Sequence, residues 1–210
     1  MRAGVIVYPG SNCDRDAYYA LELAGFKTYY ITTRDNLDSF DLIILPGGFS
    51  YGDYLRPGAV SARESLAVKE FAENGGMVIG ICNGFQILVE MGLLSGALLQ
   101  NDSGKFICKF VELEIVDNTT PFTMLYKKGE KIRLPVAHGF GRYVSVGNPN
   151  VVFKYKENIN GSDDFIAGIY NGNVLGMMPH PERAVDEFLG SVDGLKLFKS
   201  VFEYIRGGNR

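Results

Sequence analysis

The sequence predicts an α/β protein built on an open, mostly parallel sheet with helices on both faces. Short apolar runs rich in β-branched residues alternate with helical patterns through the first half of the chain. Pro and Gly residues end most of these runs. Strands that are apolar throughout are typical of a parallel sheet whose two faces are both covered by helices.

The elements of the first half follow each other in strict alternation. After the first strand, Ala17, Leu21 and Ala24 recur at helical spacing, and Gly25 stands where a C-terminal cap belongs. A long loop over residues 49–57 separates the third strand from the next helix. Strands are predicted at residues 3–8, 27–31, 41–45 and 77–81, and helices at about 17–24, 59–73 and 85–91.

The pattern changes after about residue 100. Strand-like segments joined by short polar turns follow one another with little helix between them, which indicates an antiparallel extension of the sheet. These segments are residues 106–116, 131–137, 151–155 and 165–178, and a final helix is expected at about 192–205. Without an internal repeat or a linker, residues 1–210 are expected to form a single domain.

Composition excludes several classes of function. The chain has 210 residues and a net charge of −3, with acidic and basic residues well mixed, so we expect neither nucleic acid nor a membrane surface as a partner. No apolar segment reaches the roughly 20 residues that span a bilayer. The three cysteines match no zinc pattern. With a strand-like run directly after Met1-Arg2, these features predict a cytoplasmic protein with free thiols.

The strongest chemical signal is Gly80-Ile81-Cys82-Asn83-Gly84, at a predicted strand-to-helix junction. This is the thiol form of the nucleophile turn, in which the flanking glycines avoid collisions in a very tight bend. The following helix N-terminus favours negative charge and hence the thiolate form of Cys82. The alternative for Cys82 is a small buried hydrophobe beside two loop glycines.

The chain has two histidines that could act as the catalytic base, His138 and His180. His180 follows an apolar strand in Met178-Pro179-His180-Pro181-Glu182, and residues two apart in an extended stretch point to the same side. We therefore expect Glu182 to orient the His180 ring, as the acid does in a Ser-His-Asp triad. His138 also follows a strand but has no nearby carboxylate, which leaves binding, an interface or a plain structural role open.

A second glycine-rich turn, Leu45-Pro46-Gly47-Gly48-Phe49, follows another buried strand. Adjacent glycines let backbone N–H groups approach a ligand, and acyl transfer needs such donors for its oxyanion. The N–H groups near Gly48 and Phe49 and that of Asn83 are the candidates, with a tight turn as the alternative. Gln86 is a candidate for binding the polar end of the substrate, although facing solvent is its default interpretation.

Cys13 is the alternative nucleophile, since it also lies between a strand and a helix. It lacks the G-x-C-x-G spacing, and the adjacent Asp14 is expected to raise its pKa. Cys82 is preferred.

These motifs resemble the class I (triad) glutamine amidotransferases, which carry G-I-C-N-G-F-Q, an upstream L-P-G-G and a downstream H-P-E. PGSNCDRD at residues 9–16, LPGGFSYGDYL at 45–55 and MPHPER at 178–183 are similar to the family of small glutaminase subunits of phosphoribosylformylglycinamidine synthase. The resemblance runs essentially end to end. It implies a flavodoxin-like amidotransferase fold with Cys82 as nucleophile, His180 as base and Glu182 as its orienter.

The resemblance also implies glutamine as substrate, a large ATP-using synthetase partner and a small dimeric accessory subunit. Ammonia would pass to the synthetase, which makes formylglycinamidine ribonucleotide in purine biosynthesis. No cofactor or metal is expected on this chain, because ATP and Mg²⁺ would belong to the partner. Phe140 stands where the family's H-G-x-G loop is expected to carry an acidic residue. The alternatives are a cysteine hydrolase of related fold acting on another small substrate, and a catalytically silent interaction subunit.

Overall fold

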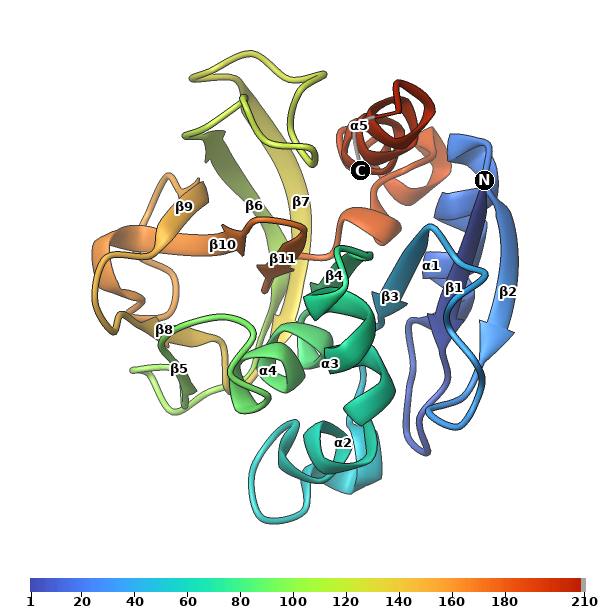
Figure 1. The fold of residues 1–210 in the computed structure, drawn as a ribbon. Helices are drawn as coiled ribbons and strands as arrows, with labels where there is room; N and C mark the ends of the chain where they lie inside the picture. The colour runs from blue at the N-terminus through green and yellow to red at the C-terminus, as the bar shows by residue number, and fades with distance from the viewer. Residues whose placement is uncertain (209–210) are drawn as a thin grey trace.

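A nine-stranded sheet runs through both halves of the chain in the computed structural model, which describes residues 1–208. The strand order is β2-β1-β3-β4-β11-β10-β9-β6-β7. The five strands from β2 to β11 pair in parallel, and the pairs from β11 to β7 are antiparallel. Figure 1 shows the antiparallel strands gathered on one side of the molecule. The predicted fold class, including the antiparallel extension, is confirmed.

Most strands agree with the predicted segments to within a few residues. The predicted segment 165–178 instead forms two strands, Ile166–Asn171 and Val174–Met177, and the second belongs to the parallel part of the sheet because it pairs with β4. The strands of this sheet are β1 Arg2–Ile6, β2 Lys27–Ile31, β3 Leu42–Leu45, β4 Met77–Ile81, β6 Ile107–Ile115, β7 Lys131–His138, β9 Asn150–Tyr155, β10 Ile166–Asn171 and β11 Val174–Met177. Every residue of β3, β4 and β11 is buried, which explains why these strands are apolar throughout. A separate two-stranded sheet, β5 Ala97–Leu99 with β8 Arg142–Val144, was not predicted, because three-residue strands carry too little periodic signal.

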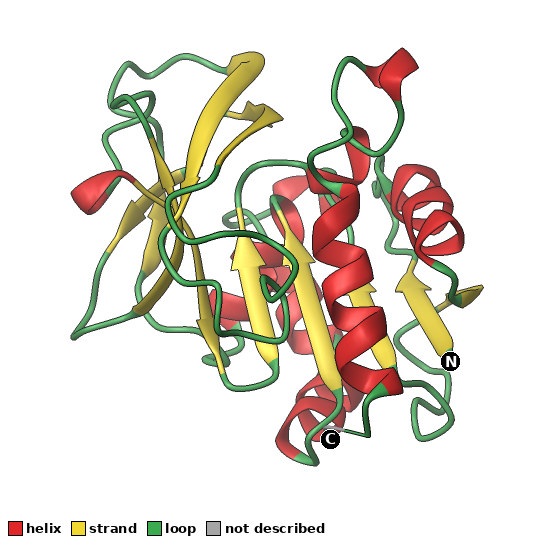
Figure 2. Ribbon diagram, turned by 90° about the horizontal axis from the view of Figure 1, so that it is seen from above, coloured by secondary structure: helices red, strands yellow, loops and turns green. Residues whose placement is uncertain are grey.

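Helices cover both faces of the parallel part (Figure 2). Helix α1 Asp14–Ala24 contacts α5 Leu195–Arg206. A second group of helices lies together, away from these two (Figure 1), and consists of α2 Ala59–Glu64, α3 Leu66–Glu73 and α4 Asn83–Glu90. None of the helices in residues 1–208 is long and apolar enough to cross a membrane.

The single helix predicted over residues 59–73 is wrong, because Ser65 divides it into α2 and α3. The Ser65 hydroxyl donates to the carbonyl of Ser61 at 2.7 Å and bonds the Tyr8 hydroxyl at 2.8 Å. A serine that bonds the preceding turn of backbone competes with regular helix geometry. The bond between Ser65 and Tyr8 therefore connects the break between the helices to the loop after β1.

The pairing of β4 with β11 decides where the site lies. The two strands are parallel, with Met177 opposite Ile81. The chain therefore leaves both strands at the same edge of the sheet, where ligands bind in open α/β sheets. Cys82 follows β4 and His180 follows β11 by three residues, so the register alone brings them to one edge.

Candidate active site

Cys82 occupies a strained turn between β4 and α4. Its backbone has φ 53° and ψ −104°, a conformation that costs a non-glycine residue about 1–3 kcal/mol. Its N–H donates to the carbonyl of Met177 at 2.8 Å, and its carbonyl accepts the N–H of Gln86 at 3.1 Å. Strain of this kind is held in place by surrounding packing and gathers at functional sites.

The two glycines of the turn are required by contact with neighbouring backbone. A Cβ on Gly84 would lie 1.9 Å from the carbonyl oxygen of Leu45, and one on Gly80 would lie 2.5 Å from the carbonyl oxygen of Gly84. Neither glycine has a positive φ. Close approach of the strand and helix, as the tight-bend argument predicts, therefore fixes both glycines.

His180 and Glu182 form a buried pair. Nδ1 of His180 donates to Oε1 of Glu182 at 2.7 Å, and the two residues are 2% and 0% exposed. The backbone differs from the extended stretch expected, because residues Pro181–Arg183 form a 3-10 turn. The turn still brings Glu182 to the ring. The N–H of His180 donates to the carbonyl of Pro135 at 2.8 Å, which anchors the residue to β7.

The charges around His180 favour its protonated form. Burial by itself lowers the pKa of the imidazole, but the charge of Glu182, the charge of Cys82 and the closeness of the Cys13 and Cys82 sulfur atoms together raise that pKa well above its ordinary value. These neighbours therefore favour an imidazolium between the carboxylate of Glu182 and the sulfur of Cys82. This is the charge arrangement that a thiolate nucleophile and an acid for the leaving group require.

Strand β7 closes over the thiol. Sγ of Cys82 lies 3.6 Å from the carbonyl oxygen of Ala137, as a weak donor. The antiparallel half of the sheet therefore curls back, so that its last strand meets the ends of β4 and β11. The site is assembled from both halves of the chain.

His138, the competing base, is buried and differently partnered. Its Nδ1 lies 3.1 Å from Oδ1 of Asn101, and burial, then the charge of His180, lower its pKa to about 4. Because the amide nitrogen of Asn101 already donates to the carbonyls of Lys105 and His138, its oxygen must accept, and His138 Nδ1 carries the proton. A neutral imidazole without a carboxylate partner is the weaker base.

The glycine-rich turn after β3 packs against the site. A Cβ on Gly47 would lie 2.7 Å from Cε1 of His180, and one on Gly48 would lie 2.7 Å from the N–H nitrogen of Asn12. The N–H of Phe49 donates to the carbonyl of Gly10 at 2.9 Å. These glycines therefore permit close approach to the base and to the loop after β1. Their role as oxyanion donors, like that of the Asn83 N–H, stays a prediction.

Asn83 and Gln86 form a buried amide network rather than facing solvent. Asn83 accepts the N–H of Ser50 at 3.2 Å and donates to Asp53 at 3.3 Å and to Oε1 of Gln86 at 2.9 Å. Nε2 of Gln86 donates to the carbonyl of Phe140 at 2.7 Å. The solvent-facing interpretation of Gln86 is wrong. The network connects the 50–53 turn and the Phe140 loop to the start of the nucleophile helix, and substrate binding by Gln86 stays a prediction.

Cys13 lies at the same site, a placement that the sequence interpretation missed. Its sulfur, a ring nitrogen of His180 and a carboxylate oxygen of Glu182 all lie within 4.8 Å of one another. Burial, more than any neighbouring charge, raises the pKa of the Cys13 thiol, so the expected role of Asp14 is wrong. The sequence offered one signal for this placement of Cys13: it follows β1, and β1 ends at the same edge of the sheet as β4 and β11.

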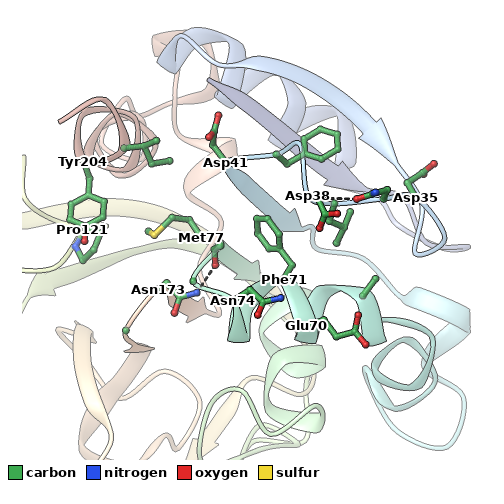
Figure 3. Close-up of a pocket in the computed structure, with 18 residues that line it drawn as sticks. Asp35, Asp38, Asp41, Glu70, Phe71, Asn74, Met77, Pro121, Asn173 and Tyr204 are labelled. Carbon is green, nitrogen blue, oxygen red and sulfur yellow. Dashed lines mark hydrogen bonds between the residues drawn. The ribbon is translucent and has the colours of Figure 1, made fainter. Parts of the chain in front are cut away.

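A pocket of about 580 Å³ lies elsewhere, among residues before β3, β4 and β11 (Figure 3). Its labelled lining residues include Asp35, Asp38, Glu70 and Asn173. None of the predicted site residues lines it. Its position at the opposite ends of the strands separates it from the thiol and the imidazole.

Comparison with known proteins agrees with this geometry. Residues 1–204 match the family of CobB/CobQ-like glutamine amidotransferase domains. The chain belongs to this family. It is 63% identical over 209 residues to the phosphoribosylformylglycinamidine synthase subunit PurQ of Thermotoga maritima, covering 98% of each chain.

Solved structures support the assignment of the amidotransferase fold. A structure of PurLQS from Thermotoga maritima aligns with a TM-score of 0.96 at 62% identity, covering 97% of this chain and 98% of that chain. A glutamine amidotransferase from Thermotoga maritima aligns with a TM-score of 0.63 at 17% identity, covering 99% of this chain and 92% of that one. The second likeness concerns the fold alone.

Proposed function

We propose that this amidotransferase is the glutaminase subunit of phosphoribosylformylglycinamidine synthase. It hydrolyses glutamine and delivers ammonia to a synthetase that converts formylglycinamide ribonucleotide to formylglycinamidine ribonucleotide. Identity of 63% to the Thermotoga maritima protein along nearly the whole of both chains supports this function over that of a related cysteine hydrolase. The same identity also favours an active enzyme over a catalytically silent interaction subunit.

The observation that carries the catalytic proposal is the 2.7 Å bond between His180 and Glu182 at the edge where Cys82 emerges. In the first step, the Cys82 thiolate attacks the side-chain carbonyl carbon of glutamine. The His180 imidazolium then gives its proton to the departing nitrogen, and ammonia leaves. Glu182 keeps the ring in the tautomer and orientation that this transfer needs.

The second step hydrolyses the γ-glutamyl thioester. His180, now neutral, takes a proton from water, and the resulting hydroxide attacks the thioester carbonyl to release glutamate and restore the thiolate. One oxyanion donor is proposed at the N–H of Gly48, since the N–H of Phe49 already donates to the carbonyl of Gly10. The N–H of Asn83 is the second proposed donor, because the first N–H groups of a helix have no partner within it. The scheme uses no metal or organic cofactor on this chain, and ATP and Mg²⁺ are assigned to the synthetase.

The partners follow from the proposed reaction. A large synthetase subunit together with a small dimeric accessory subunit completes the enzyme, and ammonia passes between sites without reaching bulk water. We place the protein in the cytoplasm, where purine intermediates and reduced thiols are available. Activity of the separate subunit is expected to be weak, since uncoupled hydrolysis would waste glutamine.

Glutamate production measured with and without the synthetase, accessory subunit, formylglycinamide ribonucleotide and ATP tests this function. We expect low turnover alone and a large increase in the complete mixture. A rate that the other subunits leave unchanged would contradict coupling. A glutamine-analogue chloroketone should alkylate Cys82 and leave Cys108, which is exposed, unmodified; labelling confined to Cys108 would contradict the assignment of the nucleophile.

A further inference from the structure

A second buried thiol contacts the catalytic base. Cys13 stands at the N-cap position of α1 without a side-chain capping bond, and it is 5% exposed. The N–H groups of Asn12 and Cys13 both donate to the carbonyl of Gly47 at 3.1 Å. The loop after β1 is thereby fastened to the turn after β3, with the Cys13 side chain directed at His180.

The space above Gly47 is shared by the sulfur and the imidazole. A Cβ on Gly47 would lie 3.3 Å from Sγ of Cys13, 3.3 Å from Nδ1 of His180 and 2.7 Å from Cε1 of the same ring. Glycine at this position lets both groups rest against one stretch of backbone. The thiol therefore borders the edge of the ring beside the bond to Glu182.

The imidazole has few other partners. Among the described residues, Nε2 of His180 and Oε2 of Glu182 are buried and have no hydrogen-bond partner. One hydrogen bond at Nδ1 is directional but does not by itself fix the plane of the ring. A group packed against the ring edge would supply the missing constraint.

We propose that Cys13 is a positioning residue, whose thiol holds the His180 ring in the plane that joins Glu182 to Cys82. The proposal rests on the glutaminase reaction assigned above. A small, soft thiol suits this place because it fills the space beside the ring and remains neutral next to a buried carboxylate. Cys13 does not compete with Cys82 as nucleophile, since only Cys82 lies at the junction of β4 with α4.

Several ionisable groups lie near the His180 ring and influence its charge. Glu182 and Cys82 act on His180 by charge, and the sulfur atoms of Cys13 and Cys82 act on it by lying close to the ring. The charge of His180 in turn acts on His138 and on Asp16. Because the nearby Cys13 sulfur favours the imidazolium, removal of this sulfur should lower the pKa of His180.

The test compares Cys13→Ala and Cys13→Ser with the unmodified chain in the complete enzyme. For Cys13→Ala we expect kcat for glutamine hydrolysis to fall on the order of tenfold, because small misplacements of a catalytic group are costly. KM for glutamine should stay within about twofold, and the alkaline limb of the pH profile should move to lower pH. Cys13→Ser keeps the shape and a hydrogen-bonding atom, so it should recover part of both effects.

A thiol that only fills space would give a different result. The melting temperature would then fall while kcat and the pH profile of the folded fraction stayed unchanged, which would overturn the proposal. A raised KM with unchanged kcat would also overturn it, by making Cys13 a substrate contact. If Cys13→Ala does not fold, Cys13→Ser tests the proposal instead. An alkaline limb of the pH profile that does not move in Cys13→Ser would count against a positioning role.

Cys108→Ala is the matched control, since Cys108 is exposed and should retain wild-type kcat and pH profile. Failure of the proposed function has its own signature, which is glutaminase activity that survives in Cys82→Ala. The two proposals can therefore fail separately.

Discussion

The carboxylate of Glu182 accepts the Nδ1–H of His180 at 2.7 Å in surroundings where neither side chain reaches solvent. A buried charge of this kind is stable only with a partner, and removal of one member leaves the other uncompensated. The pair is thus both a structural unit and the orienting half of the proposed triad.

Glu182→Gln tests the orienting role. The amide keeps the size of the side chain but lacks the charge that stabilises the imidazolium, so we expect kcat to fall by about two to four orders of magnitude. His180→Ala removes the acid and base outright and should cost at least tenfold more than Glu182→Gln. Steady-state glutaminase assays check the order, and equal or reversed losses would count against these roles.

The pH profile follows from the raised pKa of His180. Burial lowers that pKa, but Glu182 and the thiol outweigh it, so the alkaline limb of kcat/KM should lie above about 6.5, the ordinary value for histidine. Glu182→Gln removes the charge that favours the imidazolium, and its alkaline limb should move to lower pH. An unchanged or raised limb would contradict this account.

The same shift affects stability. A group whose pKa is higher in the folded than in the unfolded state stabilises the fold fully below the unfolded value, and the contribution is lost as pH rises through the folded value. Denaturant unfolding of the unmodified chain should therefore show a decline in stability on the alkaline side that His180→Ala lacks. The same decline in both proteins would assign it to other groups.

Gly47→Ala should separate catalysis from folding. The added Cβ would lie 2.7 Å from Cε1 of His180, so the ring must move away from its bond with Glu182. We expect kcat to fall on the order of a hundredfold, with a melting temperature that shows a folded protein. Gly139→Ala is the control, because its Cβ would meet only Phe106 at an ordinary 3.6 Å; equal losses of kcat in the two variants would refute the explanation.

The strained turn at Cys82 gives a stability prediction. Cys82→Ala and Cys82→Gly both lack the nucleophile and should have no glutaminase activity. Glycine accepts φ 53° without a Cβ penalty, so Cys82→Gly should be more stable than Cys82→Ala by about 1 kcal/mol. Urea unfolding at equilibrium measures the difference, and greater stability of the alanine variant would argue against strain at this residue.

Much of the fold was predictable because its signals are local. Continuous apolar runs marked β3 and β4, and Gly25, which caps α1 with a positive φ, marked the end of that helix. The division of the helix at Ser65 was not predicted, because serine is common within helices and the second partner of its hydroxyl, Tyr8, lies 57 positions away in the chain. The β5–β8 pair was missed because each of its strands has only three residues, too few to show a periodic pattern.

The sequence by itself determined the chemistry: a thiol in a glycine-flanked turn, a histidine two residues before a glutamate, and the order of strands and helices that carries them. These depend on spacing along the chain and on local geometry. Only the tertiary structure decided which groups meet. The register of β4 with β11, the return of β7 over Cys82 and the contact of Cys13 with His180 all join segments far apart in sequence, and pairing across such distances is set by the packing of the whole sheet.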